Sequence, residues 1–470
     1  MIGRASLGLG LLLGGALLSG CAGGMTVKSG EWPAYARDPG GMRHSPLTQI
    51  NRDNVTQLEL AWTYRTGELA TYAGTTLASK AAFEATPLMV DGVLYLSTPT
   101  NRVIALDAAT GALRWVYDPK LDLQLNFSEV TSRGVALWTD TTRRPGEPGY
   151  RLVYVGTIDG RLIALDAATG RPREDFGERG IIDLKVGTGP CMTASTRSRP
   201  HRPSSATSWS WATLWATIAP QPFPANLPVF GLRKATPDDA WGLTPAEAEV
   251  GRKRIAGLRY EGPFTPVSLQ ETIEAPSNTG GFNWGGLSYD PARDIIVGAV
   301  NRFAAIVKLY PRDSAPSSAG PNIRLEAELG SMLQTPYVVS RTCLLNFQRG
   351  GIPYTKPGTL QFEVPLGFML DPKEYPEAEQ WGSISLGGPM TTAGGLVFIG
   401  ATRDNHVRAF DIETGRLLWK GLLPAGAQAT PMTFESSGTQ YVVISAGGHG
   451  KLGATLGDYV MAFSLPRGRK

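Results

Sequence analysis

The chain has 470 residues, of which 42% are hydrophobic and 18% are charged, and its formal net charge is +4 at pH 7. This composition is not that of a disordered chain, and the small charge without a long Lys/Arg block argues against a nucleic-acid-binding function. The 57 glycines and 35 prolines, with many short runs of Val, Ile, Leu and Tyr, favour an all-β fold with many tight turns.

The first 20 residues have the pattern of an export signal. Arg4 precedes an apolar run that is too short for a membrane-spanning helix, and small residues lead into Cys21. Residues 1–20 resemble a bacterial lipoprotein signal peptide, in which the LSGC motif makes Cys21 the lipidated first residue of the mature protein. The alternative is an ordinary signal peptide followed by an unmodified cysteine. Because Ala22 rather than aspartate follows, we expect a periplasmic protein anchored by lipid to the outer membrane, with residues 21–29 as a linker.

Two further cysteines, Cys191 and Cys343, lie far apart in the sequence. A disulfide between them is compatible with the periplasm, but two lone cysteines are weak evidence for one.

A hairpin sequence occurs three times along the chain. The copies are NRVIALDAATGALRW, GRLIALDAATGRPRE and NHVRAFDIETGRLLW, which end at Trp115, Glu174 and Trp419. In each copy alternating apolar residues are followed by Asp, two residues, Thr and Gly. The aspartate can accept hydrogen bonds from the turn backbone, and the glycine can adopt positive φ. The turn residues are Asp107 and Gly111, Asp166 and Gly170, and Asp411 and Gly415.

A second pattern of strand, glycine turn and strand occurs at residues 85–98, 387–402 and 429–448. The two patterns together describe a four-stranded antiparallel meander, which cannot bury both faces alone. We therefore predict that such units stack radially into a β-propeller, with a β-sandwich as the alternative. Trp115 and Trp419 are expected to pack between neighbouring blades.

Several motifs resemble those of pyrroloquinoline quinone (PQQ)-dependent dehydrogenases, above all the membrane-associated quinoprotein glucose dehydrogenases. They are the segment at 31–68, the Asp-Thr-Gly hairpins, FTPVSLQ followed by GGFNWGG at 264–286, and the C-terminal segment from LPAGAQATPMT to GGHGKLGATLGDYVMAF. The resemblance implies an eight-bladed propeller that holds PQQ over its axis beside a divalent metal, usually calcium. It also implies a sugar or alcohol substrate and electron transfer to ubiquinone or a cytochrome.

The resemblance assigns cofactor contacts to Glu84, Arg133, Asn301 and Asp404, and it places His449 near the substrate. Arg133 would pair with a quinone carboxylate, which suits a guanidinium. The structural alternatives are a hairpin-end glutamate for Glu84, a turn residue for Asp404 and a satisfied loop histidine for His449.

The substrate stays open, because Glu129 stands where some glucose dehydrogenases have a histidine. A sugar or a polyol such as glucose is the expected class.

The motif that carries the family's catalytic base, of the form H-H-D-x-W-D-x-D, is absent, as is the later lysine that contacts the quinone. Asp238 and Asp239 match a different family segment and are not assigned as the base. More than a hundred residues without an Asp-Thr-Gly turn follow the Asp166 hairpin, and a smaller loss is predicted at 354–367. We therefore predict missing or incomplete blades, with no metal ligands identifiable and the catalytic base unknown.

The segment SSATSWSWATLWATIAP, at 204–220, contains three tryptophans within seven residues. If it is written in GC-rich codons and shifted back by one nucleotide, it reads as two strands around Gly-Asp and ends near Gly-Asp-Asn, where relatives place a metal ligand. We therefore interpret residues 191–220 as a frameshifted segment between N-terminal blades (30–190) and C-terminal blades (221–470), and we expect it to have low order. A sugar-stacking platform and an interfacial membrane strand are the alternatives.

Two functions follow from these patterns. The first is a quinoprotein dehydrogenase whose activity is doubtful because the base segment is missing. The second is a non-catalytic lipoprotein propeller that acts as a scaffold. Retention of Glu84, Arg133, Asp404 and His449 favours the first, because a scaffold has no use for that set.

Overall fold

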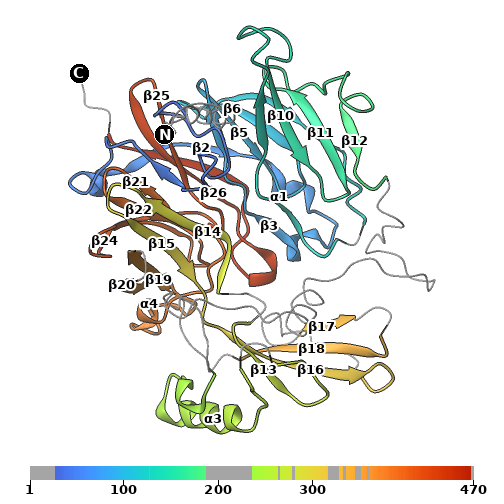
Figure 1. The fold of residues 1–470 in the computed structure, drawn as a ribbon, viewed down its shortest axis with the longest axis vertical. Coiled ribbons are helices and arrows are strands. Elements are labelled where there is room, and N and C mark those ends of the chain that lie inside the picture. The colour runs from blue at the N-terminus through green and yellow to red at the C-terminus, as the bar shows by residue number, and fades with distance from the viewer. Residues whose placement is uncertain are drawn as a thin grey trace, which may run out of the picture.

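The computed structural model describes residues 27–125, 127–186, 235–262, 265–277, 281–315, 328–331, 335–344, 351–356 and 359–466. Strands predominate in this part of the chain, and the helices are short (Figure 1). None of the described helices has the length and apolar character that crossing a membrane requires. The predicted signal peptide, Cys21, Cys191 and the segment 191–220 lie outside the described residues.

Two four-stranded antiparallel sheets follow one another in the N-terminal part of the chain. The first consists of β4 (Leu88–Val90), β5 (Val93–Ser97), β6 (Val103–Asp107) and β7 (Leu113–Tyr117). The second consists of β9 (Ala136–Thr139), β10 (Arg151–Gly156), β11 (Arg161–Asp166) and β12 (Ile181–Asp183). In both sheets each strand pairs with the next one along the chain, which confirms the predicted meander.

Two C-terminal sheets recruit strands from the beginning of the chain. One contains β21 (Met390–Thr392), β22 (Leu396–Ile399), β23 (His406–Asp411) and β24 (Leu417–Leu422), with β1 (His44–Ser45) parallel to β21. The other contains β25 (Met432–Ser436), β26 (Thr439–Ala446) and β27 (Tyr459–Ser464), and it is completed by β2 (Glu59–Arg65). Since β2 pairs antiparallel with β27, this sheet joins the two ends of the chain.

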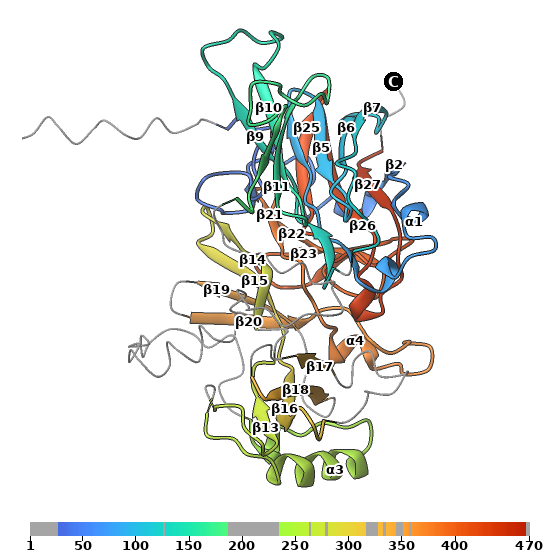
Figure 2. The same cartoon turned by 90° about the vertical axis from the view of Figure 1, so that its right-hand side faces the viewer.

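A fifth sheet is interrupted by an excursion of the chain. It consists of β14 (Phe282–Asp290), β15 (Ile295–Val300), β19 (Gly351–Lys356) and β20 (Thr359–Pro365). Between β15 and β19 the chain forms most of a separate sheet, in the order β13 (Thr272–Glu274), β16 (Ala304–Pro311), β18 (Tyr337–Leu344) and β17 (Glu328–Ser331). This sheet and helix α3 (Pro245–Ala256) lie together at one end of the molecule, with an apolar core of their own (Figures 1 and 2).

The Asp-Thr-Gly turns have the predicted geometry. Asp107 Oδ1 accepts hydrogen bonds from the backbone nitrogens of Ala109 and Thr110, at 3.2 and 3.1 Å. The same pattern occurs at Asp166 and Asp411.

The turn glycines also receive tryptophans from the neighbouring sheets. A Cβ at Gly170, where φ is +71°, would lie 2.5 Å from the ring of Trp115. Trp115 Nε1 donates to Ala167 O at 3.0 Å, so β7 of one sheet is tied to the turn of the next. Trp419 packs edge-on against Phe463 of the adjacent sheet, with the ring centres 5.2 Å apart. The predicted packing of both tryptophans between blades is therefore confirmed.

Apolar clusters join these sheets into an arc. One cluster contains residues of the β21–β24, β25–β27, β4–β7 and β9–β12 sheets, and a second joins β15 to β22 and β23. Five blades of a propeller are thus described, and an eight-bladed ring is not confirmed. Two further strands, β3 (Ala81–Phe83) and β8 (Val130–Ser132), form a parallel pair that carries part of the site.

Candidate functional site

Glu84 follows β3 directly and is only 2% exposed. Thr131 Oγ1 donates a hydrogen bond to Glu84 Oε2 at 3.3 Å, and Arg133 Nε lies 3.3 Å from the same oxygen. Both partners come from β8 or the residue after it, because β8 pairs with β3. Burial raises the pKa of Glu84 to about 7, although the charge of Arg133 opposes the shift. Near neutral pH this carboxyl group can therefore exist with or without its proton.

His449 joins this pair from the loop after β26. Its backbone bridges to Ala82 on β3, and the residue is 4% exposed. His449 Nε2 lies 3.2 Å from Glu129 Oε1 and 3.8 Å from Glu84 Oε1, whereas Nδ1 is buried without a hydrogen-bond partner. The structure therefore brings Glu84, Arg133 and His449 together, and it adds Glu129.

Glu129 stays acidic in this setting. Burial opposes its ionisation, but the hydrogen bond with His449 and the charge of Lys451 lower its pKa overall. A carboxylate thus holds the imidazole from one side.

Arg133 lies over the indole of Trp284, which β14 contributes from the FNWGG motif. The guanidinium carbon is 5.1 Å from the ring centre, a cation–π distance. The side chain of Arg133 is half exposed, so its remaining donors can reach a ligand. Trp284 packs against Ile384, Leu386 and Leu452, and its Nε1 is buried without a partner.

Three backbone segments cross closely beside Trp284. A Cβ at Gly388 would lie 2.0 Å from Gly285 O, and one at Gly387 would lie 2.5 Å from Gln428 O. Only glycine allows this approach. Gln428 is fully buried at the crossing, and neither polar atom of its side chain has a partner.

Asn301 and Asp404 are engaged elsewhere in this structure. Asn301 Nδ2 donates to Ser385 O at 2.7 Å, and its Oδ1 accepts from Ser385 N at 2.9 Å. Asp404 forms a bidentate pair with Arg408 and accepts a hydrogen bond from Thr402 Oγ1 at 2.7 Å. No described contact places either residue on the Glu84–His449 cluster, and their cofactor contacts remain predictions.

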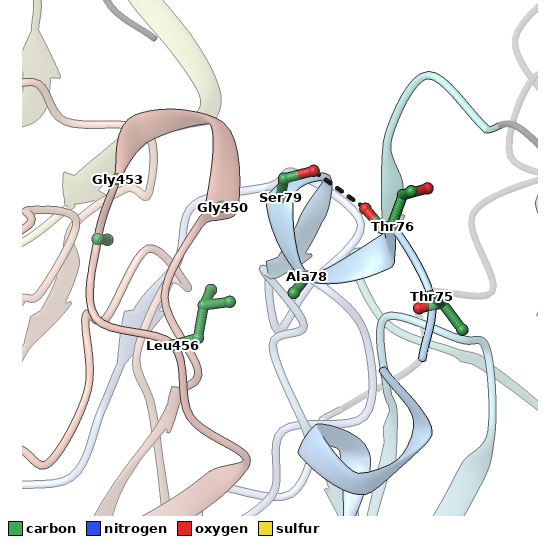
Figure 3. Close-up of a pocket in the computed structure, with 8 residues that line it drawn as sticks. Thr75, Thr76, Ala78, Ser79, Gly450, Gly453 and Leu456 are labelled. Carbon is green, nitrogen blue, oxygen red and sulfur yellow. Dashed lines mark hydrogen bonds between the residues drawn. The ribbon is translucent and has the colours of Figure 1, made fainter. Parts of the chain in front are cut away.

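A pocket of about 470 Å³ lies near the site, and His449 is not among the residues that line it. It is lined by residues of the 3₁₀ turns η2 (Leu77–Ser79) and η4 (Gly450–Leu452), whose backbones approach closely, since a Cβ at Gly450 would lie 2.2 Å from Ala78 O (Figure 3). Turn η4 begins at the residue after His449. One wall carries Thr75, Thr76 and Ser79, and the other is formed by Gly450, Gly453, Ala454 and Leu456. Small and hydroxyl-bearing walls suit a small polar molecule.

The fold agrees with a comparison of the whole sequence. Residues 32–210 and 212–442 match the family described as "PQQ: Glucose/ethanol/alcohol dehydrogenase, beta-propeller domain". The chain belongs to this family of PQQ-dependent dehydrogenases.

Curated relatives of the family cover much of the chain. The quinoprotein glucose dehydrogenase of Escherichia coli (strain K12) is 28% identical, over 94% of this chain and 79% of the relative. A probable quinate dehydrogenase (quinone) of Xanthomonas campestris pv. juglandis is 33% identical, over 77% of this chain and 45% of the relative. Among solved structures, the quinohemoprotein alcohol dehydrogenase from Comamonas testosteroni covers 94% of this chain and 81% of its own, with a TM-score of 0.58 and 18% identity, and it supports the fold.

Sequence reasoning missed two residues that border the site, Tyr35 and Arg43. The guanidinium carbon of Arg43 lies 5.1 Å from the ring centre of Tyr35, and Arg43 Nε is buried without a partner. Both stand in the EWPAYARDPGGMR segment that carries the family resemblance. Their polar character was the available signal, but they precede the first predicted strand.

The described residues fit a PQQ-type ligand better than they fit a metal. The half-exposed guanidinium of Arg133 and the unpaired Nε1 of Trp284 are donors suited to the carboxylates of a flat quinone. In the described ranges no group of three or more His, Cys, Asp or Glu residues could hold a metal ion. We therefore derive no step through a metal.

Proposed function

We propose that this chain binds PQQ at the Glu84–Arg133–Trp284–His449 cluster and descends from dehydrogenases that oxidise a sugar or polyol such as glucose. The observation that carries the proposal is the convergence of β3, β8, β14 and the loop after β26 on one buried, charged cluster. When bound, PQQ would accept the hydride of the substrate.

The chain's own residues would position the reactants. Arg133 would hold a carboxylate of the quinone, and the pKa of Glu84, about 7, allows that carboxyl group to donate or accept a hydrogen bond at the cofactor. His449, fixed by Glu129, would face the substrate side, and the pocket beside η4 would admit a polyol.

The proton acceptor is the missing part of this arrangement. The family's base motif is absent from the sequence. The alignment with the Escherichia coli enzyme spans 634 positions, more than this chain contains, so stretches of the relative have no counterpart here. We expect the chain to bind the cofactor without measurable turnover.

The cellular setting is part of the same proposal. We place the chain in the periplasm, anchored through a lipidated Cys21 to the outer membrane. Calcium would be the cofactor's metal, and ubiquinone or a cytochrome would be the electron acceptor in an active relative.

A dye-linked assay tests this proposal. Purified chain is supplied with PQQ, calcium and glucose or a polyol, and PQQ binding is measured in parallel by titration. The proposal expects saturable binding and dye reduction no faster than without protein. Dye reduction above that background would overturn the loss of activity, and absent binding would overturn the assignment of the cofactor.

A further inference from the structure

Unpaired polar atoms gather beside Trp284 in the part of the chain that the structure describes. Arg43 Nε and Trp284 Nε1 are each buried without a hydrogen-bond partner, and so are both polar side-chain atoms of Gln428. Each buried group left unpaired costs about 1–3 kcal/mol, so native proteins keep few of them. Buried polar atoms without a protein partner need a water, an ion or a ligand to satisfy them.

Strand β14 links these side chains. Trp284 lies on β14 beneath the guanidinium of Arg133. Two residues further on, Gly286 leaves room for Arg43, because a Cβ there would lie 2.7 Å from Arg43 Nη1. The same nitrogen donates to Leu287 O at 3.0 Å. Arg43 and Arg133 therefore contact neighbouring positions of one strand.

Tyr35 belongs to the same group of side chains, because the guanidinium of Arg43 lies over its aromatic ring. Burial raises the pKa of Tyr35. The charge of Arg43, a hydrogen bond with Arg43 and the charge of Arg133 oppose the shift, and the charge of Glu84 adds to it. Tyr35 therefore interacts electrostatically with Arg43, Arg133 and Glu84. Its hydroxyl group keeps its proton at neutral pH and can donate a hydrogen bond.

The chemistry of these atoms selects an anionic ligand. A phenol hydroxyl, a guanidinium and an indole N–H are donors, and two guanidinium groups supply positive charge. Charge-assisted donors of this kind bind carboxylates well, and guanidinium binds them with two parallel hydrogen bonds.

We propose that Arg43 and Tyr35 bind a second carboxylate of the quinone, in addition to the one expected at Arg133. This inference rests on the proposed function, since it takes PQQ as the ligand. It gives the segment 32–43, which precedes the blade strands, a part in cofactor binding. It also makes the site selective for a carboxylated quinone over an uncharged one.

Titration of the full chain with PQQ and with PQQ trimethyl ester, followed by tryptophan fluorescence, tests the inference. Tyr35→Phe should weaken PQQ binding about five-fold, the loss of one hydrogen bond. Arg43→Gln should weaken it about ten-fold or more, because a charge-assisted contact is lost. The ester groups carry no charge, although their carbonyl oxygens still accept hydrogen bonds, so Arg43→Gln should weaken binding of the ester much less than binding of PQQ.

Control variants are Tyr154→Phe on β10 and Arg52→Gln, which pairs with Asp411 and Glu413. Both should bind PQQ as the wild type does. Tyr35→Phe removes one atom, so it keeps the test decisive if Arg43→Gln fails to fold.

Two results would contradict the inference in distinguishable ways. If the wild type binds PQQ but Tyr35→Phe binds it unchanged, or if Arg43→Gln weakens binding of the ester as much as binding of PQQ, the carboxylate contact is wrong and the proposed function stands. If the wild type does not bind PQQ at all, both are wrong.

Discussion

Glu84 combines three properties that a surface glutamate lacks. It is buried, it shares one carboxylate oxygen between Thr131 and Arg133, and it lies 3.8 Å from a histidine. Burial destabilises the charged form of Glu84 by more than Arg133, His449 and Thr131 stabilise it, and its pKa is therefore raised. A carboxyl group in this state responds to pH in the physiological range.

The pKa of Glu84 predicts a pH dependence of stability. Because the folded-state pKa, about 7, lies above the 4.5 of an exposed glutamate, the unfolded chain loses this proton first as pH rises. The contribution to the free energy of unfolding should therefore fall by about 3 kcal/mol between pH 4.5 and 7. Glu84→Gln should remove that part of the slope, as measured by urea unfolding at pH 5 and pH 8.

Glu274 provides an internal reference for this measurement. Burial raises the pKa of Glu274 to about 7 as well. Its contribution to the pH dependence of unfolding is therefore present in the wild type and in Glu84→Gln. An equal difference in unfolding free energy between wild type and variant at the two pH values would contradict the account of Glu84.

At this scale sequence reasoning identified residues that lie in recognisable motifs. Glu84, Arg133 and His449 were predicted and lie together, while Asn301 and Asp404 are bonded to Ser385 and Arg408. Tyr35 and Arg43 were not predicted, because their proximity to the site depends on the packing of a segment without strand pattern against β14.

The repeated turn is the element that joins one blade to the next. In two of the three Asp-Thr-Gly turns, an aromatic ring from a neighbouring sheet lies against the turn glycine. Trp115 lies against Gly170 in this way, and Trp62 of β2 lies against Gly111. Each of these tryptophan side chains therefore contributes to the contact between two blades as well as to the core of its own sheet.

Trp115→Ala should reduce the free energy of unfolding by roughly 3 kcal/mol, at the low end for a lost tryptophan because the ring is only partly buried. The lost hydrogen bond to Ala167 adds to the effect. Trp138→Ala on β9, where the side chain is 49% exposed, is the matched control and should change stability by no more than about 0.5 kcal/mol. Equal losses in guanidinium chloride unfolding would contradict the role of Trp115.

Element prediction succeeded where the signal is local. A hairpin with its turn residues is contained in about fifteen residues, so β6 and β7 and β23 and β24 were predicted. Helix α3 was missed although Thr244 and Glu247 form a capping box and Pro245 is the first helical residue. The β13–β16–β18–β17 sheet was missed because its strands are separated along the chain and carry no repeated turn.

The molecule as a whole depends on a closure between its ends. Strand β2 completes the sheet of β25–β27, and Asp458, 2% exposed, secures the junction. Its carboxylate lies 2.5 Å from Arg65 Nε and accepts a hydrogen bond from Gly67 N at 2.9 Å. The N-terminal segment that holds Tyr35 and Arg43 therefore belongs to the same arc as the C-terminal site residues.

Asp458→Asn should lower the free energy of unfolding by about 1–3 kcal/mol. A neutral amide cannot form the ion pair with Arg65, and its NH₂ group cannot accept the hydrogen bond of Arg65 or of Gly67 N. Glu59→Gln, an exposed position at the other end of β2, is the control and should be nearly neutral. Thermal unfolding of the full chain measures both. A wild-type melting temperature in Asp458→Asn would show that this junction does not stabilise the closure.

The propeller architecture was predictable because one blade pattern is repeated, whereas the number of blades was not. A repeated sequence pattern predicts the structure of one blade, but closure of the propeller depends on the number of blades present. The prediction of missing blades therefore rested on spacing, and the segment 191–220 on which much of it depends lies outside the described residues.

The central claim is that the chain keeps a PQQ site formed around Arg133. Absorbance titration of the full chain with PQQ, beside Arg133→Gln and the control Arg52→Gln, tests it most directly. The account predicts saturable binding by the wild type and by Arg52→Gln, and binding at least about ten-fold weaker by Arg133→Gln, since a charge-assisted contact is lost. No saturable binding by the wild type, or equal affinity in Arg133→Gln, would contradict it.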